Sequence, residues 1–308
     1  MKKISFLFSI LTLLFLFSIN SFAQSDTTIK VLIVTAHPDD DALFSATVYK
    51  ITHNLGGKVD LCLITNGEGG YKYSTLGEPI YGLELTDEAV GREYLPDIRK
   101  KELKAGCAIV GIKDFFFLDQ KDHRYTTDVH EIMDSTVWDI PFVKRRLKEI
   151  IEAGKYNYIF CLLPVPTTHA HHASSAILTL QVVNEMPLST RPVVLGGTMS
   201  SKGDTTKFTF TGLEKYPVTK ISPDPLMFTF DRTAPFGFQD RLNYKIIANW
   251  VIAEHKSQGT MQLLMNMGDI EEYIWYDLND KNKIEQTKQL FDKLAINYFK
   301  KKDYDLTK

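Results

Sequence analysis

Two kinds of hydrophobic pattern alternate through the first half of the chain. Short apolar runs rich in β-branched residues predict strands at 30–36, 59–65, 115–118 and 158–163. Apolar residues recurring every three or four positions predict helices at 42–55, 98–110 and 142–153. Nearly continuous apolar strands that alternate with amphipathic helices are typical of a parallel sheet covered on both faces. We therefore predict a Rossmann-like α/β fold with a mostly parallel sheet flanked by helices.

The second half has a less regular pattern. Residues 192–212 predict β structure with turns, residues 240–259 predict an amphipathic helix, and residues 285–299 predict a terminal helix. No linker requires a second domain. We therefore expect one domain over residues 24–308, with a less regular C-terminal β/α extension.

The first residues resemble an export signal. Lys2 and Lys3 precede an apolar run, and Ser21-Phe22-Ala23 offers a small-residue cleavage site. This order predicts a signal peptide over residues 1–23 and a mature protein that is periplasmic or secreted. An uncleaved anchor is the alternative, although the run is short beside the roughly 20 residues that span a membrane.

Charge and cysteine content narrow the classes of function. The chain has 36 Lys and Arg against 38 Asp and Glu, and no clustered basic face that would indicate nucleic-acid binding. We expect neither a nucleic-acid partner nor membrane association after signal cleavage. Cys62, Cys107 and Cys161 stand in apolar stretches, where a cysteine behaves as a small buried hydrophobe.

A polar cluster follows the first predicted strand. The sequence His37-Pro38-Asp39-Asp40-Asp41 comes where an open parallel sheet places its ligands, beyond the carboxyl ends of the strands. Proline stiffens this turn. Adjacent carboxylates repel one another unless a cation or hydrogen bonds compensate. A helix cap would account for one aspartate but not for the histidine.

A second cluster follows the fourth predicted strand. His169, His171 and His172 fall within four positions, and His169 and His172 share a face if a helix begins there. His37, Asp40 and His172 could bind one metal and leave a position open for water, as in catalytic zinc sites. Two histidines and a carboxylate also describe iron(II) sites, so other divalent metals stay open.

With these residues the chain resembles the PIG-L/LmbE family of zinc-dependent de-N-acetylases. "TAHPDDD" resembles the family's Ala-His-Pro-Asp-Asp-Glu signature, and "HAHH" resembles its His-x-x-His motif. The segments "LITNGEGG" and "IRKKELKAGCAIVGI" resemble two further family motifs, and "HKSQ" is a weaker match. Together the motifs span roughly residues 30–258.

The resemblance implies a role for each matching residue. The implied zinc ligands are His37, Asp40 and His172, the implied catalytic residues are Asp39 and His169, and the implied substrate-binding residues are Arg99 and His255. Asp39 would be the general base toward zinc-activated water. His169 would stabilise the oxyanion or protonate the leaving amine.

The implied activity is removal of the N-acetyl group from an N-acetylated amino sugar or its glycoside. An amidase acting on another amino-sugar conjugate would use the same site. A non-catalytic carbohydrate-binding protein with a structural metal is the alternative from another class. Structural zinc sites normally have four protein ligands, whereas three are present here together with an acid and a base. This favours an enzyme with a small-molecule or glycan substrate.

The chain departs from the family pattern at two places. Asp41 replaces the usual glutamate, and Ala170-His171 replaces the usual proline and aspartate. We expect His171 at the surface, with an extra substrate contact as the alternative. Tyrosines in the long connection 71–97 would either form a sugar-stacking wall or pack the connection onto the body. The glycines of "TNGEGG" lack dinucleotide-binding spacing and are expected to permit close backbone approach or a tight turn.

Overall fold

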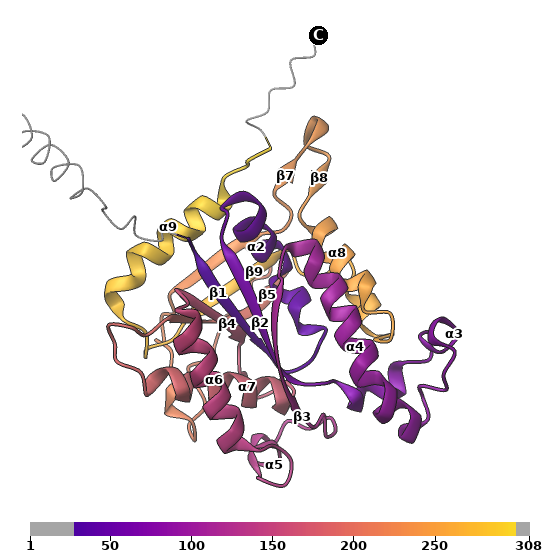
Figure 1. Ribbon diagram of the computed structural model, residues 1–308. Helices are drawn as coiled ribbons and strands as arrows, with labels where there is room; N and C mark the ends of the chain where they lie inside the picture. Colours follow the sequence, from indigo (N-terminus) through magenta and orange to yellow (C-terminus); the bar gives the residue numbers. More distant parts are fainter. Residues whose placement is uncertain (1–27, 300–308) are drawn as a thin grey trace, which may run out of the picture.

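A twisted seven-stranded sheet forms the centre of the computed structural model, which describes residues 28–299 (Figure 1). Its strands are β1 (Lys30–Thr35), β2 (Lys58–Thr65), β3 (Asp114–Gln120), β4 (Tyr158–Leu162), β5 (Val193–Ser200), β6 (Met227–Asp231) and β9 (Ile270–Trp275). The helices are α2 (Ser45–Tyr49), α3 (Glu78–Tyr81), α4 (Glu88–Val110), α5 (Val129–Met133), α6 (Ile140–Gly154), α7 (Ala170–Asn184), α8 (Lys245–Glu254) and α9 (Ile284–Ala295). The predicted fold class is confirmed.

The strand order is β3-β2-β1-β4-β5-β9-β6. Strands β1 to β5 run parallel, whereas β9 is antiparallel to both β5 and β6. Strand β1 lies between β2 and β4, and the chain order reverses at this point. The crevice outside the carboxyl ends of β1 and β4 is therefore the expected ligand position of such a sheet.

Alternate residues of β1 enter two different cores. Val31 and Ile33 pack in one core with residues of α2, α4 and α8, whereas Leu32 and Val34 pack in the other with residues of α6 and α7. Figure 1 shows these helices on opposite faces of the sheet. All four side chains are fully buried, and each contributes about 1.5–3 kcal/mol relative to an exposed position. Burial on both faces is the reason that the strand has an uninterrupted apolar pattern.

The three cysteines are buried and free, as expected from their apolar surroundings. Cys107 belongs to α4 and packs in the core that this helix shares with α2 and α8, and Cys62 and Cys161 pack in the core beside α6 and α7.

Two helices predicted in the first half of the chain differ from the structure. The segment 42–55 divides into a 3₁₀ turn η1 (Asp40–Phe44), the short α2 and a π-helical turn η2 (Lys50–Asn54). Helix α4 begins at Glu88, ten residues before the predicted start at Ile98, and contains Pro96. A proline discourages a helix prediction because it lacks an amide donor. The side chain of Asp87 caps the start by accepting a hydrogen bond from the Val90 amide at 3.0 Å.

The C-terminal half was predicted less well. Only β5 of the β structure expected at 192–212 is present as a strand, and β6 and β9 were not predicted. Strand β9 contains Glu271, which is fully buried because Arg232 and backbone amides bind its carboxylate. A buried glutamate looks like an exposed position in a hydropathy pattern. The terminal helix α9 ends at Ala295 rather than at Phe299.

The predicted signal peptide, residues 1–23, lies outside the described residues. Signal cleavage and the single domain of residues 24–308 therefore stay predictions. Within residues 28–299, no helix combines the length and the apolar character needed to cross a membrane.

Candidate metal centre

The candidate site lies at the carboxyl edge of the parallel strands. His37 follows β1, Asp122 follows β3, and His169 and His172 follow β4. The "TNGEGG" segment that follows β2 adds Gly67, two residues beyond the end of that strand. The sheet topology thus brings together polar residues that are spread over more than a hundred positions of the sequence.

The three predicted metal ligands direct ligand atoms toward one another. The Nδ1 atom of His37 lies 3.0 Å from Nε2 of His172, and Oδ1 of Asp40 lies 3.1 Å from the same Nε2. The Nδ1 atom of His37 lies 3.8 Å from Oδ2 of Asp40. The backbone amides of Ala36 and His37 donate to Oδ2 of Asp40 at 3.0 and 2.8 Å, which fixes the carboxylate.

These separations fit a divalent metal. Tetrahedral ligands at 2.0–2.1 Å from zinc lie roughly 3.3–3.4 Å from one another. Two of the three observed separations are within a few tenths of an ångström of that value, and one atom from each residue can be chosen so that all lie within 4.8 Å. Two imidazole nitrogens and one carboxylate oxygen are also the ligand types of catalytic zinc sites. His37, Asp40 and His172 therefore fit a zinc ion.

The electrostatics of the cluster favour ionised carboxylates. Burial opposes ionisation of Asp40, but His172 and His37 hold the pKa of Asp40 well below its usual range. Burial also lowers the pKa of His37, yet Asp122 and then Asp40 and Asp39 raise it to about 9. Opposite charges within a few ångströms stabilise one another in this way. The cluster is thus negatively charged unless protons or a cation compensate it.

His171 is fully buried, so the predicted surface position was wrong. It lies on the side of His37 that faces away from Asp40 and His172. Its Nδ1 atom lies 3.0 Å from Nε2 of His37 and 3.2 Å from Oδ1 of Asp122. Its ring stacks on Trp138, with centroids 5.4 Å apart and planes 22° apart. The prediction was wrong because a hydrophobic pattern does not distinguish a buried histidine from an exposed one at the start of a helix.

Asp39 and Arg99 form an ion pair at the edge of the site. One Nη2 atom of Arg99 lies 3.2 Å from Oδ1 of Asp39, and a second guanidinium nitrogen donates to the carbonyl of Gly67. The Asp39 side chain is 22% exposed, whereas that of Arg99 is 3% exposed. Arg99 therefore lies beneath Asp39 and away from solvent.

Glycines of the "TNGEGG" segment permit close packing around these charges. Gly67 has φ +75°, and a Cβ there would lie 2.1 Å from the Arg99 guanidinium. A Cβ on Gly69 would lie 2.8 Å from the Asp122 carboxyl carbon, and the Gly69 amide donates to Oδ2 of Asp122 at 3.0 Å. The expectation of close backbone approach is confirmed, since only glycine leaves room at both positions.

His169 caps helix α7. Its Nδ1 atom accepts a hydrogen bond from the His171 amide at 3.2 Å. Burial, and then the neighbouring His37, His171 and His172, lower the pKa of His169 to about 3. The ring is therefore neutral near pH 7, with its proton on Nε2 because Nδ1 is the acceptor.

An exposed tyrosine that the sequence reasoning missed lies beside His169. Tyr125, in the loop after β3, is 73% exposed, and its ring centroid is 4.9 Å from that of His169. The neighbouring Thr126 carbonyl accepts a hydrogen bond from the Ala170 amide at 2.7 Å, which ties the two segments together. An aromatic residue shortly after a strand end in such a sheet was the available signal.

The third aspartate faces away from the metal ligands. Asp41 is buried, with Oδ1 3.0 Å from Nε2 of His255 and Oδ2 3.5 Å from Sγ of Cys107. His255 is itself 0% exposed. The predicted contact of His255 with substrate is not supported, because the residue is buried behind the loop that follows β1.

The tyrosines of the 71–97 segment have different positions. Tyr71 is buried against Leu85 and Leu95, and the Tyr81 hydroxyl donates to Glu102 at 2.7 Å. Those two pack the segment onto the body. Tyr73 and Tyr94 are 57% and 43% exposed.

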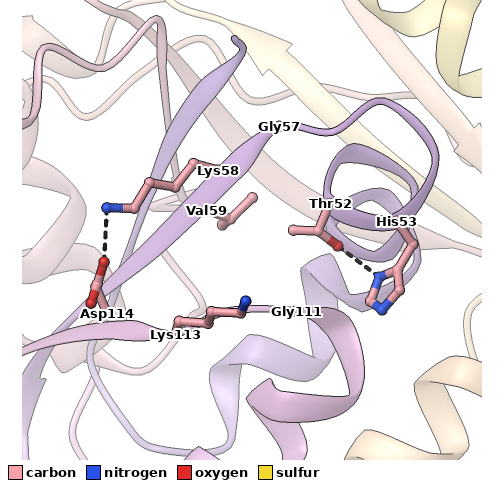
Figure 2. Close-up of a pocket in the computed structure, with 8 residues that line it drawn as sticks. All are labelled: Thr52, His53, Gly57, Lys58, Val59, Gly111, Lys113 and Asp114. Carbon is pink, nitrogen blue, oxygen red and sulfur yellow. Dashed lines mark hydrogen bonds and ion pairs between the residues drawn. The ribbon is translucent and has the colours of Figure 1, made fainter.

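A cavity of about 450 Å³ lies at the opposite end of the sheet (Figure 2). Lys58 and Asp114, at the amino ends of β2 and β3, form an ion pair of 2.8 Å in its wall. His53 also lines it, but the side chains that could hold a metal together lie elsewhere in the described residues. The candidate site is therefore the polar cluster and not this cavity.

A family model and a curated relative both match this chain. Residues 32–183 match the PIG-L family model, described as GlcNAc-PI de-N-acetylase. Over 164 residues the chain is 28% identical to the probable N-acetyl-alpha-D-glucosaminyl L-malate deacetylase 2 of Bacillus cereus. That match covers 53% of this chain and 65% of the relative, which is less than two thirds of its length.

One solved structure supports the fold. The pseudoaglycone deacetylase Dbv21 matches with a TM-score of 0.50 and 13% identity, over 81% of this chain and 98% of that one. The N,N'-diacetylchitobiose deacetylase of Pyrococcus horikoshii matches with a TM-score of 0.38 and 21% identity, over 54% and 53% of the two chains. At such identities the likeness to Dbv21 concerns the fold alone.

Proposed function

Because residues 32–183 make this chain a member of the PIG-L family, we propose that it is a metal-dependent deacetylase of an N-acetylated amino sugar or its glycoside. The observation that carries this proposal is the convergence of His37, Asp40 and His172 with a separate, partly exposed Asp39 beside them. Metal ligands alone do not indicate catalysis, but a carboxylate beside them that is not a ligand supplies a base. A bound zinc ion would polarise the amide carbonyl and make water more acidic.

Asp39 is the proposed general base. Asp40 receives backbone amides and faces His172, whereas Asp39 turns toward Arg99. Arg99 holds one oxygen of Asp39, so the other oxygen can accept a proton from the attacking water. This assigns Arg99 to orienting the base, in place of the substrate contact that the resemblance implied.

His169 is the proposed hydrogen-bond donor to the amide oxygen. Its Nδ1 atom is occupied by the His171 amide, so its Nε2–H is the group left to donate. A positioned donor of this kind stabilises the negative charge that develops on oxygen. Asp39 then returns its proton to the nitrogen as the C–N bond breaks, and the products are acetate and a free amine.

Acetate release from defined sugars tests this proposal. The protein, loaded with zinc, is incubated with N-acetylglucosamine, its glycosides and N-acetylated disaccharides, and both acetate and free amine are measured. We expect acetate and amine in equal amounts from at least one sugar. The variant His172→Ala should release neither. Other amide-linked amino-sugar conjugates are included in the same panel. Amine without acetate from one of these conjugates would indicate an amidase, and no product from any substrate with a zinc-loaded protein would contradict an enzymatic role.

Zinc is the proposed native metal. The two imidazoles and one carboxylate of the site suit zinc and also iron(II). An exported protein would meet oxidising conditions that make iron(II) less suitable. Elemental analysis of protein purified without added metal should show about one zinc per chain, and a predominance of iron would contradict this assignment.

Export is proposed from the sequence of the first 23 residues. The basic, apolar and small-residue segments occur in the order of a cleavable signal. Intact-mass analysis of protein recovered outside the cytoplasm of its host should show an N-terminus close to Gln24. A full-length product confined to the cytoplasm would contradict export.

A further inference from the structure

Two side chains meet His37 on the side that faces away from Asp40 and His172. The Nδ1 atom of His171 lies 3.0 Å from Nε2 of His37, and Oδ1 of Asp122 lies 3.7 Å from it. The same Asp122 oxygen lies 3.2 Å from Nδ1 of His171. His37 therefore has its two ring nitrogens in different surroundings, with Nδ1 toward the ligands and Nε2 toward this pair.

We propose that His171, together with Asp122, is a positioning residue that holds His37 with Nδ1 directed at the metal. The inference rests on the metal site of the proposed function. An imidazole that binds a metal through one nitrogen carries its proton on the other, and this N–H needs an acceptor. The Nδ1 atom of His171 lies at hydrogen-bond distance from Nε2 of His37, whereas the Asp122 oxygen, 3.7 Å away, is beyond that distance and acts on the N–H through its charge.

The ring of His171 is itself firmly held. It is 0% exposed and stacks on Trp138, whose Nε1–H donates to the Lys121 carbonyl at 3.0 Å. Its Nε2 atom has no hydrogen-bond partner within residues 28–299, so Nδ1 is the polar atom that fixes its orientation. A ring confined by packing can define the angle of the ring that it contacts.

Asp122 is fixed from the side of β2. Its Oδ2 atom accepts from the Gly69 amide, and its own amide donates to the Glu68 carboxylate, both at 3.0 Å. A side chain at position 69 would collide with its carboxyl group. Segments after β2, β3 and β4 thus converge on one histidine that follows β1.

His171 could instead be a metal ligand, because His37, His169 and His171 also bring ligand atoms within 4.8 Å of one another. The exposure of the side chains favours the set of His37, Asp40 and His172. The side chain of His172 is 21% exposed and can meet a substrate, whereas that of His171 is 0% exposed. The set with Asp40 also contains an anionic ligand.

Zinc affinity of three His171 variants tests the proposal without using catalysis. Asparagine places an oxygen near the position of Nδ1, glutamine reaches toward the position of Nε2, and leucine has no polar atom. His171→Leu should weaken zinc binding about 10- to 100-fold, as measured by chelator competition. His171→Asn should stay within a few-fold of the parent, and His171→Gln should bind more weakly than His171→Asn.

Saturated samples separate positioning from ligation. At excess zinc every folded variant should bind one zinc per chain, and X-ray absorption should show two imidazoles in parent and variants alike. One imidazole fewer in His171→Leu would make His171 a ligand and overturn the proposal. Equal affinity of all three variants would also overturn it, because packing alone would then suffice.

Two controls protect this test. His53→Leu changes a histidine in the cavity at the opposite end of the sheet and should leave zinc affinity unchanged. Thermal unfolding in chelator identifies variants that fail to fold, and the comparison of His171→Asn with His171→Gln decides the matter if His171→Leu is among them. Failure of the parent to release acetate would contradict the proposed function, but it would leave the order of zinc affinities to decide this inference.

Discussion

The loop after β1 has a front and a back with opposite chemistry. On the front, His37 and Asp40 direct nitrogen and oxygen atoms toward a common point, and Asp39 keeps one oxygen free of its ion pair with Arg99. On the back, Asp41 is buried against His255, a residue from the far end of the chain. The consecutive aspartates thus lie in two different environments, Asp39 and Asp40 at the metal site and Asp41 in the interior.

The back of the loop continues into a saturated charge network. Glu271 accepts hydrogen bonds from the amides of Ala46 and Thr47 at 3.0 Å each and from Nε of Arg232 at 2.8 Å. Arg232 also donates to the carbonyls of Ala42 and Leu43 at 2.7 Å each. Every charged group in this network has a partner of opposite charge or a backbone group.

The comparison shows how a protein can keep reactive groups close together. Converging donor atoms on the front repel one another or compete for protons until a cation joins them. On the back, the contact of Asp41 with His255 and the ion pair of Glu271 with Arg232 fix the loop. Glu271, Arg232 and His255 all lie outside residues 32–183, so the C-terminal extension holds a loop that belongs to the family-matched segment.

The largest effect should come from Asp39 on the front of the loop. Asp39→Asn keeps the size of the side chain but removes the proton acceptor. We expect kcat to fall about 10²- to 10⁴-fold, with zinc content and folding unchanged. Acetate release and elemental analysis measure the two properties. Loss of zinc would show that Asp39 is a ligand, and parental turnover would remove it from the mechanism.

The ligand on the front should fail differently. Asp40→Ala should lose most of the zinc, and activity with it. Relative to the metal-free parent, the metal-free variant should lose only about 1–3 kcal/mol of stability, because the Ala36 and His37 amides are left without their acceptor. Urea unfolding in chelator makes that comparison. If Asp40→Ala retained one zinc per chain, the ligand set would be wrong.

On the back, Glu271→Gln should reduce stability rather than chemistry. The change leaves Arg232 as a buried cation without its anion, which costs about 3–5 kcal/mol. Urea unfolding of the metal-free protein should show this loss. Lys202→Met breaks an exposed ion pair with Asp231 on the neighbouring β6 and should change stability little. Equal stability of Glu271→Gln and Lys202→Met would contradict the proposal that the Glu271 ion pair stabilises the loop.

Asp41→Asn should have a smaller effect on the same side. The neutral amide weakens the contact with His255, and the cost should be about 1–3 kcal/mol, the usual range for a disturbed buried polar group. Turnover should stay measurable because Asp41 does not face the metal ligands. A collapse of kcat with normal stability would mean that Asp41 acts in the reaction.

The front of the loop could be predicted from sequence, whereas its back could not. Histidines and aspartates directly after apolar strands are unusual locally, and the parallel topology brings strand ends together. The partners of Asp41 and Glu271 depend on where β9 and α8 pack, which no local pattern specifies. His171 was misplaced for the same reason, because the ring of Trp138 that covers it comes from a separate segment.

The smallest effect should come from the rim of the front. Tyr125 is exposed beside His169, where an aromatic face can pack against the apolar face of a sugar ring. Tyr125→Ala should raise KM about 2- to 10-fold with kcat nearly unchanged, since it removes binding that ground state and transition state share. Tyr125→Phe retains the ring and should behave like the parent. Steady-state kinetics on the best sugar of the panel decide between these outcomes. A loss confined to kcat would show instead that Tyr125 positions His169. The contact between the two rings would then serve catalysis and not substrate binding.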